Sequence, residues 1–116
     1  SVTGRWATYD SLDEGATRAG WATITQVGRR VKIEVTRERK RNGTDMPEPR
    51  HFTYRGRFRS PNLAATFYDR RADHAIGAIV LHYRPGSKVL AGKTMYFDDD
   101  TAAEVVAHPF VLRRSN

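Results

Sequence analysis

Hydrophobic and polar residues alternate with a period of two along most of this chain, and the 3.6-residue period of an amphipathic helix is almost absent. β-Branched and aromatic residues are concentrated in the alternating stretches, and Gly, Pro, Asn and Asp residues separate them. The pattern predicts eight strands, at residues 4–9, 17–27, 30–39, 50–59, 63–70, 75–84, 88–97 and 103–113. Residues 40–49, with the sequence KRNGTDMPEP, are predicted to form one long polar loop.

Short turn sequences connect the predicted strands as antiparallel neighbours. Gly28-Arg29, Ser60-Pro61-Asn62 and Pro85-Gly86-Ser87 have the composition of tight hairpin turns. Closure into a barrel removes the exposed edges that eight antiparallel strands would otherwise leave. The predicted fold is therefore all-β, an eight-stranded antiparallel up-and-down β-barrel, lipocalin-like in shape. A two-sheet sandwich is the alternative, and residues 1–116 form a single domain in either case.

The three turns also predict which side chains face the barrel interior, because side chains alternate between the two faces of a strand. The predicted inward pairs are Gln26 with Val31, Ile24 with Ile33, Ala22 with Val35, Phe58 with Leu63, Gly56 with Ala65, Tyr54 with Phe67, Leu81 with Leu90, Ile79 with Gly92, and Gly77 with Thr94. By the same alternation Tyr96 faces inward, while Lys93 and Arg57 face outward.

The predicted interior is mostly apolar but contains polar groups. These are Gln26, Tyr54, Thr94 and Tyr96, with Trp6 and His108 beside them. An eight-stranded barrel is either filled by side chains or holds one small ligand, and glycines and polar groups among apolar walls favour a ligand. The alternative is that the tyrosine hydroxyls are hydrogen-bonded at the rim, that Gln26 bonds the backbone, and that the glycines only allow the strands to coil.

The charge of the chain indicates which class of partner it binds. Twenty Lys and Arg residues against 13 Asp and Glu residues give a formal net charge of +7, which favours nucleotides, nucleic acid or a lipid surface over cationic partners. An eight-strand meander gathers basic residues without acidic neighbours at the end that carries both termini, and a solvated surface is the alternative interpretation. These residues are Arg5, Arg29, Arg30, Arg57, Arg59, Arg84, Lys88, Arg113 and Arg114. The absence of cysteine excludes disulfides, thiolate zinc sites and a cysteine nucleophile.

Several spaced motifs resemble a known family. They are Gln26-Val27-Gly28-Arg29-Arg30-Val31, Tyr54, the stretch HAIGAIVL at 74–81, Leu90-Ala91-Gly92 and the stretch FVLRR at 110–114. Together they resemble, over residues 20–114, the barrel domain of bacterial two-transmembrane β-strand-rich effectors of the SMODS-associating family. These effectors accompany cyclic oligonucleotide synthases in CBASS and related anti-phage systems. Where relatives carry an aromatic residue two positions after the Leu-x-Gly glycine, this chain has Thr94, with Tyr96 two positions further on.

The resemblance implies a cytoplasmic sensor barrel that binds a cyclic dinucleotide as its regulatory ligand. It also implies N-terminal helices before Ser1 that anchor the protein in the bacterial inner membrane, with the basic end against lipid phosphates, and a homo-oligomer in the full-length protein. A cyclic dinucleotide needs aromatic faces, hydrogen-bonding groups and cations. The candidate binding residues are Trp6, Gln26, Tyr54, Arg57, Arg70, Lys93, Thr94 and Tyr96.

Features of other functional classes are also present in the sequence or can be looked for in it. Gly4-Arg5-Trp6 matches the Gly-x-Trp of the first lipocalin strand, and arginines of the last strand would lie on the Trp ring, which favours a carrier of a small hydrophobic ligand. A single-stranded nucleic-acid module fits the charge, but five-stranded OB architecture does not suit eight strands, so no DNA or RNA partner is expected. The four histidines lack metal-ligand spacing, and nucleophile and phosphate-loop motifs are missing.

No enzymatic activity, catalytic residue, metal site or bound cofactor is therefore predicted. Asp98, Asp99 and Asp100 are the residues with the composition of a divalent-cation site, and a solvated acidic turn is the favoured interpretation of them.

Overall fold

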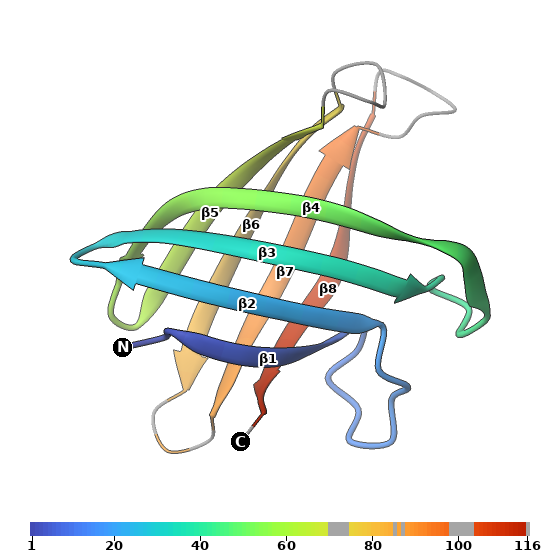
Figure 1. The fold of residues 1–116 in the computed structure, drawn as a ribbon, viewed down its shortest axis with the longest axis horizontal. Helices are drawn as coiled ribbons and strands as arrows, with labels where there is room; N and C mark the ends of the chain where they lie inside the picture. Colours follow the sequence, from blue (N-terminus) through green and yellow to red (C-terminus); the bar gives the residue numbers. More distant parts are fainter. Residues whose placement is uncertain (70–74, 85, 87, 98–103, 116) are drawn as a thin grey trace.

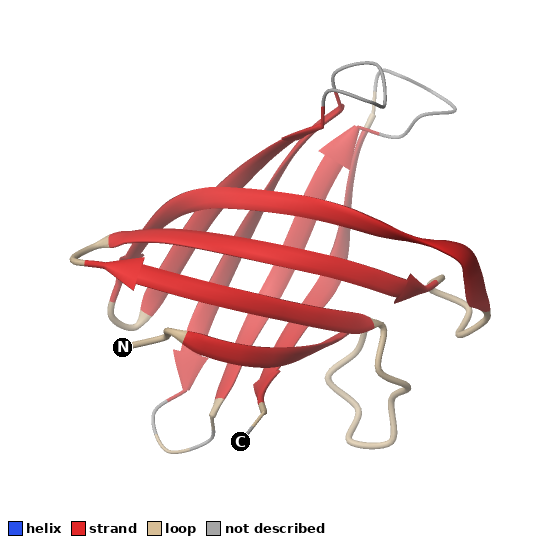
Figure 2. Cartoon of the chain, viewed as in Figure 1, coloured by secondary structure: helices blue, strands red, loops and turns tan. Residues whose placement is uncertain are grey.

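Eight antiparallel strands close into one barrel in the computed structural model of the protein, which describes residues 1–69, 75–84, 86, 88–97 and 104–115 (Figure 1). The strands are β1 (Gly4–Tyr9), β2 (Gly20–Val27), β3 (Arg30–Arg39), β4 (Asp45–Arg59), β5 (Asn62–Asp69), β6 (Ala75–Arg84), β7 (Val89–Phe97) and β8 (Val105–Arg114). Each strand pairs with its neighbour in sequence, and β1 closes the barrel on β8. The described residues contain strands and loops without a helix (Figure 2). The predicted all-β, eight-stranded up-and-down barrel is confirmed.

Among the described residues, no helix is long and apolar enough to cross a lipid bilayer.

The barrel is flattened into two layers that cross. Figure 1 shows β1–β4 running across the front and β5–β8 running behind them at a steep angle. The radius of gyration is 13.7 Å, close to the value of about 13 Å expected for a globular chain of roughly this length. The hydrophobic core lies between the two layers.

Three strands have the predicted bounds, and the largest difference concerns β4. The predicted loop at 40–49 is wrong in its second half, because β4 begins at Asp45, which pairs with Arg39 beyond a bulge in β3. Pro47 and Pro49 interrupt the hydrophobic alternation there, so the sequence has the composition of a loop although the backbone is extended. β2 begins at Gly20 and not at the predicted residue 17, so the residues from 17 to 19 belong to the connection before it.

The predicted register is confirmed for two hairpins and wrong for a third. The β2–β3 and β4–β5 pairs are as predicted, and Gly28 has the positive φ of 60° that a tight hairpin turn requires. In the β6–β7 hairpin the register differs by two residues, so that Ile79 pairs with Thr94 and Gly77 with Tyr96. The predicted pairs require a connection of two residues after Arg84. In the structure Arg84 pairs with Val89, so the connection spans residues 85–88. An even shift leaves every side chain on its predicted face.

Glycines allow the barrel strands to approach one another closely. A Cβ atom added to Gly92 would overlap the carbonyl oxygen of Val80, and one added to Gly56 would overlap that of Ala64. These two glycines therefore allow neighbouring strands to lie closer together than a side chain would permit.

The N-terminal residues cover the barrel end that carries both termini, here called the closed end. Val2 is fully buried, its N–H donates to Gln26 Oε1 at 2.9 Å, and its carbonyl oxygen accepts from Trp6 Nε1 at 3.0 Å. The Arg114 guanidinium lies 4.4 Å from the centre of the Trp6 ring and donates to the carbonyl oxygens of Thr3 and Ser1 at 2.8 and 3.0 Å. The predicted contact of a last-strand arginine with Trp6 is confirmed.

Candidate binding site at the barrel mouth

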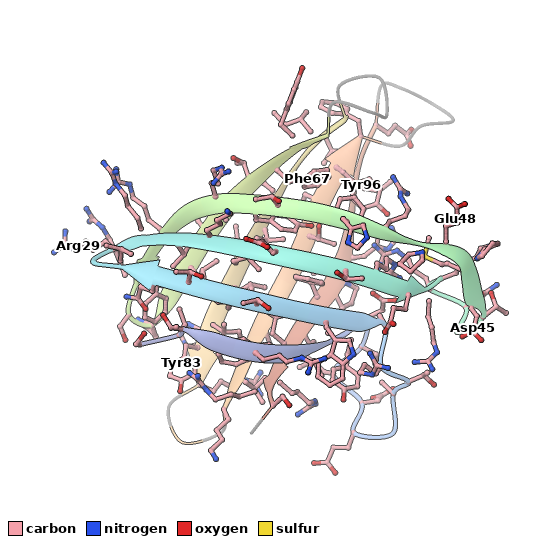
Figure 3. All side chains as sticks on the ribbon, in the orientation of Figure 1. Arg29, Asp45, Glu48, Phe67, Tyr83 and Tyr96 are labelled. Carbon is pink, nitrogen blue, oxygen red and sulfur yellow. The ribbon has the colours of Figure 1, made fainter. Side chains whose placement is uncertain are left out.

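Charged and aromatic side chains gather at the end of the barrel opposite the closed end. This group, here called the mouth cluster, consists of Asp10, Arg37, Arg41, Tyr96 and His108. Its members come from four strands or the residues next to them: the end of β1, β3 and the connection after it, β7 and β8. In Figure 3 the labelled Tyr96 lies toward this end. The meander therefore brings together residues that are far apart in the sequence.

One carboxylate faces two guanidinium groups in the mouth cluster. Arg37 binds Asp10 in a bidentate manner, with Nη1 donating to Oδ1 at 2.8 Å and Nη2 donating to Oδ2, and each of the two side chains is only 18% exposed. Arg41 Nη1 lies 3.5 Å from Asp10 Oδ1, and its Nη2 donates to Tyr96 Oη at 3.3 Å. These three charged groups sum to one positive charge. Guanidinium groups offer five donors each, so both retain capacity to bind an anion.

The rings of Tyr96 and His108 form a platform beside these cations. Their centres are 5.8 Å apart and their planes are inclined by 34°. Burial lowers the pKa of His108, and the positive charge of Arg41 lowers it further. The neutral imidazole is therefore favoured at pH 7. The guanidinium of Arg41 lies over the Tyr96 ring, 5.9 Å from its centre.

Two hydroxyl side chains lie below the platform, inside the barrel. Tyr54 and Thr94 are 6% and 5% exposed, and their polar side chains lie near one another. Burial raises the pKa of Tyr54, so its phenol stays protonated at neutral pH. The Tyr54 ring packs edge-on against Phe67, at 5.1 Å between centres, and lies 6.4 Å from Phe110. Aromatic packing thus fixes the floor of the mouth.

A pocket of about 230 Å³ adjoins the mouth cluster between the β1–β2 and β3–β4 connections. Its lining residues are Asp10, Ser11, Ala16, Thr17, Ala19, Arg39, Lys40, Arg41, Asn42 and Gly43. Asp10 and Arg41 belong to both the pocket and the mouth cluster. Of the other cations, Arg39 is bound to Asp45 at 3.2 Å and to the carbonyl oxygen of Arg18. The mouth cluster therefore has a polar recess beside it, with Lys40 and Arg41 in its lining.

Three of the predicted site residues come together at this end. Tyr54, Thr94 and Tyr96 face inward on β4 and β7, as predicted, and lie beside or below the cations of the mouth cluster. Arg70 lies outside the described residues, as do Asp98, Asp99 and Asp100.

The other predicted site residues that the structure describes lie away from the mouth cluster. Trp6 is fully buried at the closed end, and Gln26 bonds backbone groups there, accepting from Val2 and donating to the carbonyl oxygen of Gly28 at 2.8 Å. Arg57 and Lys93 are exposed on the outer face, because each is flanked in its strand by inward-facing residues.

The charged members of the mouth cluster were missed by sequence reasoning. Arg37 continues the inward alternation of Val31, Ile33 and Val35, and this signal was present in the sequence. Its pairing with Asp10 depends on the register of β1 and β3 on either side of β2, in which Thr8 and Arg37 both pair with Gly20. Among the described residues, no group of three or more His, Asp or Glu side chains is placed to hold a metal ion.

Comparisons of the chain with protein-family models, curated proteins and solved structures found no match.

Proposed function

We propose that this protein is a binding barrel for a small anionic ligand with aromatic rings, and that the ligand is a cyclic dinucleotide. The observation that carries the proposal is the mouth cluster, in which two guanidinium groups share one carboxylate beside the Tyr96–His108 platform. A phosphodiester accepts hydrogen bonds from guanidinium groups in a bidentate geometry. A nucleobase stacks on aromatic rings, which contributes about 1–3 kcal/mol per base.

Asp10 forms ion pairs with both Arg37 and Arg41. A phosphate that approaches Arg37 and Arg41 adds negative charge to a site whose charged groups sum to one positive charge, so the pairing with Asp10 need not be broken completely. The hydroxyl of Tyr96 can form a hydrogen bond with a base edge or a sugar oxygen. Each chemical need of a cyclic dinucleotide thus has a matching group at this end.

The placement of charge is compatible with a membrane effector. In the proposal, helices outside these residues anchor the barrel in the bacterial inner membrane, and the mouth faces the cytoplasm. The closed end carries exposed Arg29, Arg30 and Arg57, and each such cation near an anionic leaflet contributes roughly 1 kcal/mol. Ligand binding would shift the population between a quiet and an assembled form of the effector, provided that the ligand binds one form better.

A second candidate function is that of a lipocalin-like carrier for a small hydrophobic ligand. It is favoured by the closed end, where Gly4 and Trp6 form the Gly-x-Trp pattern and Arg114 lies over the Trp6 ring. The charged and hydroxylated lining of the mouth favours an anionic polar ligand over a purely apolar one.

Titration calorimetry with a panel of cyclic di- and trinucleotides tests the proposal, with the matching linear dinucleotides as controls. We expect at least one cyclic dinucleotide to bind with a micromolar or lower dissociation constant, more tightly than its linear counterpart. Failure of the whole panel to bind at tens of micromolar would refute the proposal. Displacement of a bound hydrophobic fluorophore by fatty acids, without nucleotide binding, would establish the carrier function instead.

A further inference from the structure

The outer surface of the barrel differs strongly between its two layers. On β2–β4 the outward side chains include Thr25, Lys32, Glu34, Arg55 and Arg57, all exposed. On β6–β8 they are mainly apolar: Ile76, Val80, Phe97 and Val105 are 51%, 53%, 51% and 59% exposed, with Ala78 and Ala107 between them. These six residues define the β6–β8 face, which lies on the far side of the barrel in Figure 1.

The β6–β8 face is continuous across three strands. Ala78 pairs with Met95, and Met95 pairs with Ala107, so one row of small and medium side chains crosses the sheet. Phe97 pairs with Val105 in the next row on the same face. Within residues 76–80, 93–97 and 105–109, all of which are described, Lys93 is the one charged side chain. Glu104 is exposed just beyond the edge of the face.

We propose that a second copy of this chain covers the β6–β8 face, packing face to face about a two-fold axis near the Met95–Ala107 pair. Half-exposed side chains of this size leave roughly 400–500 Å² of apolar surface on the face, toward the upper end of the range of about 300–600 Å² for the largest patch on a typical monomer. A homodimer needs about 800 Å² from each partner, part of it from a polar rim. The face therefore has the area of the apolar centre of such an interface.

Charge selects this face for contact between identical copies. Two chains that each carry a net charge of +7 repel one another, and the β2–β4 surface would bring Lys32, Arg55 and Arg57 of both copies together. The β6–β8 face brings together apolar groups and very few charges.

Sedimentation velocity from low to hundreds of micromolar protein tests this inference, and no ligand is needed. The wild-type protein is expected to reach a dimer within this range. Val105→Glu is expected to weaken dimerisation at least about tenfold, because it places a carboxylate opposite Phe97 in the apolar face, whereas the matched outer-face change Thr25→Glu leaves it unaltered. Circular dichroism checks that both variants fold.

A wild-type protein that stays monomeric at hundreds of micromolar, or a Val105→Glu variant that dimerises like the wild type, would overturn the inference. Binding to uncharged lipid vesicles by a chain that remains monomeric in buffer would overturn it as well, since lipid would then be the occupant of the face.

Discussion

Replacing Arg41 with methionine removes one of the two cations of the mouth cluster while keeping a side chain of similar length. The Arg41 guanidinium lies 3.5 Å from Asp10 Oδ1 and donates to Tyr96 Oη, and its side chain is 35% exposed. Arg37 keeps its bidentate contact with Asp10 in this variant, so the carboxylate remains paired. An exposed ion pair contributes at most about 1 kcal/mol to folding. We therefore expect the variant to fold with nearly the same free energy of unfolding as the wild type.

The expected effect on binding follows from the loss of one phosphate contact. A hydrogen bond to a charged group contributes about 1.5–3 kcal/mol, and the Coulomb energy of two unit charges about 4 Å apart is roughly 1–4 kcal/mol between water and a protein surface. The partial exposure of Arg41 places the loss in the lower half of these ranges. The dissociation constant for a cyclic dinucleotide is thus expected to rise about 10- to 50-fold.

Titration calorimetry at physiological salt measures this change, with Arg55→Met as the matched control. Arg55 is exposed on the outer face of β4, and its removal changes the net charge by the same amount. At physiological ionic strength, exposed charges more than about 8 Å apart are largely screened, so the control is expected to change the affinity less than about twofold. Equal losses in the two variants would show that the arginines act only through net charge, and would refute the assignment of Arg41 to the binding site.

Three further predictions concern the closed end, the barrel curvature and pH. Arg114→Met, which removes the contact with the Trp6 ring and two hydrogen bonds to the N-terminal segment, is expected to lower the free energy of unfolding in urea by about 1–3 kcal/mol; an unchanged value would show that the closed end does not depend on this side chain. Gly92→Ala is expected to lower it by about 1–3 kcal/mol, because the added Cβ overlaps the carbonyl oxygen of Val80 and the strands must move apart; wild-type stability would contradict the close approach. The pKa of His108 is lowered in the folded state, so its contribution to stability is present above pH 6.5 and is lost as the pH falls through the folded value. An anionic ligand raises that pKa again, so binding is expected to take up a proton and to strengthen below pH 7, which calorimetry in buffers of different ionisation enthalpy detects; proton uptake that persists in His108→Asn would contradict this assignment.

Local patterns were sufficient to predict the fold. Alternation with a period of two and the turn composition at Gly28 and Ser60 determine strand order and facing, and both depend only on residues close in sequence. The β6–β7 register depends on the length of the connection after Arg84, which composition does not determine. The start of β4 was missed because Pro47 breaks the alternation while the backbone remains extended.

The site was predicted only in part because alternation gives the facing of a side chain but not its depth along the barrel. Trp6 and Tyr96 both belong to the inward set, yet Trp6 is covered by Val2 at the closed end and Tyr96 contacts Arg41 at the mouth. The contact of Asp10 with Arg37 joins the end of β1 to β3 across β2. This contact follows from the register of the three strands, in which Thr8 and Arg37 both pair with Gly20. The long connection between β1 and β2 gives no local signal for that register.

Binding of the ligand at the mouth, between the arginines and the Tyr96–His108 platform, can be tested residue by residue with amide NMR spectra of ¹⁵N-labelled protein, recorded during titration with cyclic di-AMP, cyclic di-GMP and cyclic GMP–AMP. We expect at least one of these ligands to shift the signals of Arg37, Arg41, Tyr96 and His108 and to leave the indole N–H signal of Trp6 unchanged. Shifts centred on the closed end or the outer face, or no shifts with any of the three ligands, would contradict it.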